Sequence, residues 1–116
     1  MDKKTAKYWK SEIKKHFEKI KDETTLTRIF NLIDPLRIKL DSTDFKHVNG
    51  GESFARKCYK NNKRKLCIID LYDILDWNVT KYDVAQTNEI ISILEQIKDI
   101  NDKNFWEKLI AVFRGS

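Results

Sequence analysis

The chain has 116 residues, of which 41% are hydrophobic and 35% charged, and its net charge is +5. A chain of this length is expected to fold as a single domain, residues 1–116, with a sizeable core. No apolar run approaches the roughly 20 residues of a membrane-spanning helix, and the basic start lacks the apolar stretch of a signal peptide. We therefore expect a cytoplasmic protein whose thiols are reduced.

The charge is unevenly distributed along the sequence. Through Lys65 the basic residues outnumber the acidic ones two to one, whereas from Leu66 onward acidic residues predominate. The first part is suited to bind polyanions or acidic protein surfaces, and the second part is not. This polarity argues against a protein that coats nucleic acid uniformly.

Apolar residues at helical spacing predict two helices at the start of the chain. The first stripe consists of Trp9, Ile13, Phe17 and Ile20. It predicts a helix from about Lys3 to Lys21. A second apolar face covers Leu26–Ile33, and Pro35 is expected to end this helix because the residue before proline is pushed out of the helical region. The short connection predicts an antiparallel helical hairpin.

The run KYWKSEIKKHFEKIKDETTLTRIFNLI resembles the helical hairpin of small phage and mobile-element proteins of low-GC Gram-positive bacteria. The shared features are a Trp-Lys start, an Ile-Lys-Asp-Glu junction and a Leu-x-x-Ile-Phe second helix, which together cover roughly the first 33 residues. In its size the chain is also similar to the type II anti-CRISPR inhibitors. This resemblance implies an accessory protein that binds a host protein, such as a Cas9-type effector, and blocks its nucleic-acid loading.

The middle of the chain is predicted to form a small antiparallel meander. Apolar and basic residues alternate over Leu36–Leu40, as in a half-buried strand, although a helical continuation is an alternative. Phe45–Val48 would form a second strand. The runs Phe54–Tyr59 and Leu66–Tyr72 would form a β-hairpin, because the intervening Asn61-Asn62 suits a tight turn.

Two further helices are predicted near the end of the chain. The first begins near Thr80 and Asp83. The second carries the apolar face of Phe105–Phe113 and stops at Gly115. Together these elements predict an α+β domain with an N-terminal helical hairpin, a small antiparallel β-meander and two C-terminal helices packed over one face of the sheet.

Both cysteines lie in the predicted hairpin. A turn centred on Asn62 and Lys63 places Cys58 opposite Cys67, a geometry that suits a cross-strand disulfide or two ligands of one metal ion. The expected cytoplasmic location argues against the disulfide. Two inert thiols that pack as small hydrophobic side chains are the simpler alternative.

The two histidines complete a possible metal site. Zinc takes four nitrogen or sulfur ligands in structural sites. The candidate ligands are His47, Cys58, Cys67 and His16. Asp70 is an alternative fourth ligand, and His16 has a simpler interpretation as a histidine at the edge of the core, hydrogen-bonded to backbone.

The tip of the predicted hairpin is strongly basic. Its candidate partner-binding residues are Arg56, Lys57, Lys60, Lys63, Arg64 and Lys65. They suit an acidic protein surface, or a nucleic acid that would bind in a salt-dependent manner. The simpler alternative is a solvated hairpin whose charges protect its edges from aggregation.

No catalytic motif stands out. Asp70, Asp73 and Asp76 are spaced as possible ligands of a divalent ion, but a polar helical turn explains them as well. A Cys-His nucleophile pair built on His47 lacks an orienting third group. We therefore predict a non-enzymatic protein that binds a host protein stoichiometrically, with a direct DNA- or RNA-binding regulator as the alternative.

Overall fold

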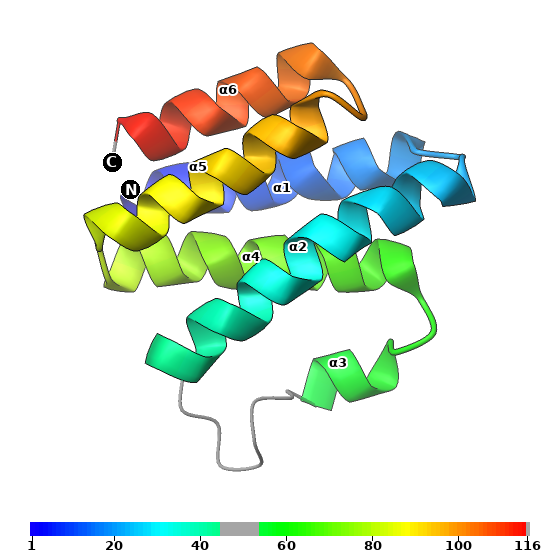
Figure 1. Ribbon diagram of the computed structural model, residues 1–116, viewed down its shortest axis with the longest axis horizontal. Helices are drawn as coiled ribbons and strands as arrows, with labels where there is room; N and C mark the ends of the chain where they lie inside the picture. The colour runs from blue at the N-terminus through cyan, green and yellow to red at the C-terminus, as the bar shows by residue number, and fades with distance from the viewer. Residues whose placement is uncertain (45–53, 116) are drawn as a thin grey trace.

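The computed structural model describes residues 1–44 and 54–115, and this part of the chain is built from helices without a β-strand (Figure 1). The helices are α1 (Lys3–Lys19), α2 (Glu23–Asp44), α3 (Phe54–Cys58), α4 (Lys63–Thr80), α5 (Val84–Lys98) and α6 (Lys103–Arg114). The predicted α+β class is therefore wrong. None of the described helices is long and apolar enough to cross a membrane.

α4 is the central helix of the bundle. It packs against α1, α2 and α3, while α5 packs against α2 and α6. Its buried residues are Leu66, Cys67, Asp70, Leu71, Ile74, Leu75, Trp77 and Asn78. A helix covered from several sides lacks the one-sided apolar stripe by which a helix is recognised in a sequence. For this reason the sequence pattern of Leu66–Tyr72 predicted a strand, and this prediction is wrong.

The predicted hairpin turn is the start of α4. The side-chain Oδ1 of Asn62 accepts a hydrogen bond from the backbone N–H of Lys65 at 3.1 Å and so caps the helix. Asparagine is favoured both in tight turns and at helix N-caps, so the residue type alone does not distinguish them. The segment before this turn is the short helix α3, and the predicted β-hairpin is wrong.

α2 continues through Pro35, so the predicted helix end at this proline and the predicted strand at Leu36–Leu40 are both wrong, and the alternative of a helical continuation is confirmed. The apolar stripe recurs every three or four residues on both sides of the proline, at Leu26, Ile29, Ile33, Leu36 and Leu40. Its burial outweighs the cost of a proline in a helix interior, which is about 3 kcal/mol. The predicted strand at Phe45–Val48 lies outside the described residues.

The predicted helices at the two ends of the chain are confirmed. α1 buries Trp9, Ile13 and Phe17, as its stripe predicted, and α6 ends at Arg114 next to Gly115. A short connection joins α1 to α2, but α2 runs obliquely in Figure 1 and packs mainly on α4 and α5. The predicted antiparallel packing of these two helices on each other is therefore replaced by the packing of both on α4.

α5 begins at Val84, directly after Asp83. The earlier of its two predicted start signals, Thr80, is not part of this helix. Asp83 is the N-cap, and its Oδ1 accepts a hydrogen bond from the backbone N–H of Gln86 at 3.0 Å. Thr80 is instead the last residue of α4, where its hydroxyl donates to the carbonyl of Asp76 at 3.0 Å. The connection between these two helices is thus short.

Candidate functional site

The predicted basic cluster does not form one continuous surface. The guanidinium of Arg64 donates to the carbonyls of Phe17 and Ile20, at 3.1 and 2.7 Å, and thereby satisfies carbonyl groups at the end of α1. The ammonium of Lys63 donates to the hydroxyl of Thr27 at 3.2 Å. Four lysines of the cluster are exposed: Lys57, Lys60, Lys63 and Lys65.

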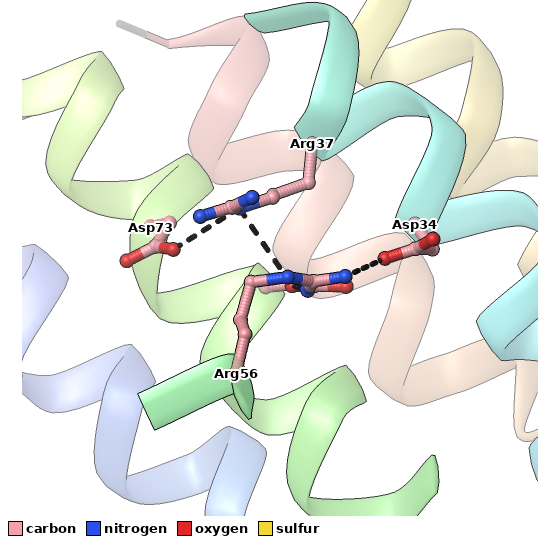
Figure 2. A network of polar contacts seen from close by, with 5 residues as sticks. Asp34, Arg37, Arg56 and Asp73 are labelled. Carbon is pink, nitrogen blue, oxygen red and sulfur yellow. Dashed lines mark hydrogen bonds and ion pairs between the residues drawn. The ribbon is translucent and has the colours of Figure 1, made fainter. Parts of the chain in front are cut away.

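Arg56 belongs to a buried charge network between α2, α3 and α4 (Figure 2). Its guanidinium donates to the carboxylates of Asp70 on α4 and Asp34 on α2. Nε of Arg37 lies 3.3 Å from Oδ2 of Asp73 and 3.8 Å from Oδ1 of Asp70. Arg37 and Asp70 are almost completely buried, so these charges interact with little screening by water.

Asp70 is the most deeply buried carboxylate of this network. Its Oδ2 is buried and has no hydrogen-bond partner in the described part of the chain. Burial raises the pKa of Asp70 to about 7, although the neighbouring Arg56 acts to lower it. Burial also raises the pKa of Asp73, against the opposing effect of Arg37. Both carboxyl groups therefore bind a proton more strongly in the folded chain than in the unfolded chain.

The charge network holds α3 in place. A helix of five residues has little stability of its own. Arg56 joins α3 to α4 through Asp70 and to α2 through Asp34. Because Tyr59 directly follows α3, the network also positions the turn that leads into α4.

The predicted zinc ligands do not come together in the described part of the chain. Cys58 is exposed at the end of α3, and Cys67 is buried on α4. Both thiols are free, so the alternative disulfide is not formed. His47 lies outside the described residues, and the described ones contain no group of three residues that could hold a metal ion. The structure thus gives the predicted zinc site no support.

His16 lies at the junction between α1 and α6, where Oδ2 of the exposed Asp102 lies 4.0 Å from its Nδ1. Oδ1 of Asn101 accepts from the indole N–H of Trp106 at 2.9 Å and also from Nε2–H of His16 at 2.7 Å. The imidazole stacks on Phe105, with the ring centroids 3.8 Å apart. Burial lowers the pKa of His16. Its predicted place at the edge of the core is confirmed, but its hydrogen-bond partner is a side chain rather than backbone.

The three aspartates considered as ligands of a divalent ion have cationic partners instead. Asp70 and Asp73 belong to the charge network, and Oδ1 of Asp76 lies 2.6 Å from Nζ of Lys10. Each carboxylate therefore meets a basic side chain of another helix. Their spacing places them along α4 at the contacts with α2 and α1.

A groove of about 270 Å³ lies between α1 and α4. Its lining includes Lys14 of α1, Tyr59 of the turn after α3, and Lys65, Ile68, Ile69 and Tyr72 of α4. The isoleucines and tyrosines give it an apolar floor, whereas both lysines are exposed at its sides. We call this feature the α1–α4 groove.

Lysine side chains lie close to both tyrosines of the groove. Nζ of Lys65 is 5.0 Å from the ring centroid of Tyr59, and Nζ of Lys10 is 5.6 Å from that of Tyr72. Such cation–π contacts keep the ammonium groups beside the aromatic rings. Apolar surface and positive charge are therefore presented together.

The lysines of α1 extend this positive charge. Lys3, Lys7, Lys10 and Lys14 follow one another at intervals of three or four residues and so lie on one side of the helix. This is the groove side, because Lys10 meets Asp76 of α4 and Lys14 lines the groove. This row was not predicted from the sequence, although its helical spacing is a recognisable signal.

No family model, no curated protein and no solved structure matches the chain. The resemblance of the first residues to phage-type helical hairpins stays a prediction. The function proposed below rests on the residues of this chain alone.

Proposed function

We propose that this is a non-enzymatic binding protein, which associates stoichiometrically with a partner protein through the α1–α4 groove and the lysines around it. The observation that carries the proposal is the row of lysines on α1 beside a groove with an apolar floor. Protein interfaces commonly combine an apolar centre with a polar rim. Lysines in the rim favour a partner that is acidic at this position.

The composition of the groove favours a protein partner over a nucleic acid. Ile68 and Ile69 present aliphatic surface, which has no counterpart in a phosphate backbone. Glu18 also lines the groove, and Asp76 lies beside Lys10 at its edge. Both carboxylates would repel a continuous row of phosphates, whereas a protein segment can place its acidic residues to avoid them.

A host protein such as a Cas9-type effector is the partner class that the sequence resemblance implies, and it stays a prediction. The basic groove would support it by contacting an acidic part of that protein. The mechanism would be occupation of a surface that nucleic acid otherwise uses.

The proposal is tested by capture of partners on the tagged protein from a nuclease-treated lysate of a low-GC Gram-positive bacterium. Native mass spectrometry then measures the stoichiometry of the complex. We expect a protein complex of fixed stoichiometry, which is lost when Lys7, Lys14 and Lys65 are replaced together by glutamate.

The matched control is the triple variant Lys4→Glu, Lys15→Glu and Lys108→Glu, which changes the net charge equally at exposed lysines away from the groove. It should retain the complex. Equal loss in both triple variants would show a non-specific effect of charge and contradict the proposal. Capture that requires intact nucleic acid, with a mobility shift that weakens steeply in salt, would support the nucleic-acid alternative instead.

A further inference from the structure

We infer that the α1–α4 groove receives one bulky apolar side chain of the partner, with carboxylates of the same segment contacting Lys14 and Lys65. This inference rests on the proposed function and specifies the chemistry of the partner. The groove itself, its floor and the position of its two lysines each contribute a step.

The volume of the groove limits what can enter it. At about 270 Å³ it is smaller than the roughly 300–1,000 Å³ of pockets that hold drug-sized ligands. One leucine, phenylalanine or tryptophan side chain is a better match for this space. Single anchors of this kind, seated in a pocket, contribute most of the binding energy at many protein interfaces.

The floor and walls of the groove match such an anchor. Ile68, Ile69 and the ring of Tyr72 offer apolar contact, and all three are only partly covered by the rest of the chain. Tyr59 closes one part of the groove from the turn after α3. Burying a large apolar side chain against these residues removes apolar surface from water and so favours binding.

Lys14 and Lys65 favour a partner segment that carries negatively charged residues beside the anchor. Lys14 comes from α1 and Lys65 from α4, so cationic groups flank the groove on two sides. Nζ of Lys65 is already held 5.0 Å from the ring centroid of Tyr59, which reduces the freedom it would lose on binding. Aspartate or glutamate within about one helical turn of the anchor can reach these ammonium groups.

The experiment is a selection from displayed random dodecapeptides against the full chain. We expect the enriched sequences to share one Leu, Phe or Trp with several Asp or Glu within a few residues of it. A synthetic peptide of this consensus should bind about tenfold or more weakly to K14E/K65E and to the uncharged floor variant Ile69→Ser. The matched variant K4E/K15E should bind it within about twofold.

The outcomes separate the anchor from the proposed function. Acidic peptides without a shared apolar residue, whose binding Ile69→Ser leaves unchanged, would overturn the anchor and leave the proposed function standing. Failure to enrich any sequence would also overturn the anchor, because the capture experiment measures the proposed function independently. Peptides unaffected by K14E/K65E, or a single-stranded oligothymidylate that displaces them, would overturn both.

Discussion

The junction of α2, α3 and α4 brings together five charged residues, three of which are buried, whereas the junction of α1 with α6 is held by an imidazole, an amide and aromatic rings. In the first, Arg56 is surrounded by Asp34 and Asp70. In the second, Asn101 accepts hydrogen bonds from both His16 and Trp106. A buried charge is costly unless all its partners are present, while neutral groups lose only their own contacts.

The two junctions also respond to pH in opposite directions. Burial raises the pKa of Asp70, so the folded chain favours a proton on this carboxyl group. Burial lowers the pKa of His16, so the folded chain disfavours a proton on this imidazole. In wild-type protein below about pH 6.5, the ordinary pKa of histidine, the two effects on the free energy of unfolding are expected to cancel in part. Single variants are needed to observe each junction separately.

The largest effect is expected from Arg56→Met. The substitution leaves the buried carboxylate of Asp70 and the partly buried one of Asp34 without this guanidinium, and removal of one member of a buried ion pair costs about 3–5 kcal/mol. We expect the free energy of unfolding to fall by about 3 kcal/mol, as measured by urea denaturation.

The neighbouring exposed Lys57 provides the control. Lys57→Met should change the free energy of unfolding by less than about 0.5 kcal/mol. If the two substitutions have similar effects, the charge network does not hold α3 as described.

The next effect is the pH dependence of Asp70→Asn. The pKa of Asp70 in the folded chain, about 7, lies above its ordinary value of 3.8, so the proton bound there stabilises the fold at low pH. This contribution is lost as the pH rises from about 4 to above 7, by at most about 1.4 kcal/mol per pH unit. Asparagine does not titrate, so wild type should lose stability relative to the variant between about pH 4 and 7.

Urea denaturation of both proteins across this range gives the difference directly, and His16 cancels because both contain it. Asp99→Asn is the control for the loss of one exposed carboxylate, since Asp99 lies outside the charge network. A stability of wild type that rises relative to Asp70→Asn with pH would mean that the guanidiniums dominate and the pKa of Asp70 is low.

A smaller effect is expected at the junction of α1 with α6 from His16→Gln. Glutamine can still donate to Asn101 but loses the stacking on Phe105, so the cost near pH 7.5 should be about 1 kcal/mol. Because the pKa of His16 is lowered in the folded chain, its contribution is lost as the pH falls below about 6.5. The difference between wild type and variant in thermal unfolding should therefore narrow at acidic pH, and a constant difference would contradict this.

A helix is easier to predict from the sequence when other helices cover only one of its sides. The helices of the two junctions differ in this respect. α1 and α6 show clear apolar stripes, so their existence and the place of His16 at the edge of the core could be predicted. α4 is covered by α1, α2 and α3, and its apolar residues show no single side. Its helical character could therefore not be recognised from periodicity.

The charge network had a weak signal in the sequence. Arg37 follows Asp34 by three residues, and Asp73 follows Asp70 by three, each pair within an apolar helical stretch. This spacing indicates charges on one side of each helix, but their partners depend on how α2 crosses α4. That crossing is a tertiary feature. It depends on α2 continuing through Leu36–Leu40, where the sequence pattern predicted a strand.

The smallest effect is expected from Cys58→Ser. Cys58 is exposed on α3, whereas Cys67 is buried on α4, where burial raises the pKa of its thiol. Cys58→Ser should change the free energy of unfolding by less than about 0.5 kcal/mol, and a thiol reagent should modify Cys58 quickly and Cys67 slowly. Equal reactivity of both thiols in native protein would contradict the buried position of Cys67.

Binding at the α1–α4 groove is tested most directly by NMR spectra of labelled protein during titration with the captured partner. We predict that the largest shifts occur in the methyl groups of Ile68 and Ile69 and in the rings of Tyr59 and Tyr72, while Ile91 of α5 is unaffected. Shifts concentrated on α5 and α6, with the groove signals unchanged, would place the partner elsewhere and contradict the proposed function.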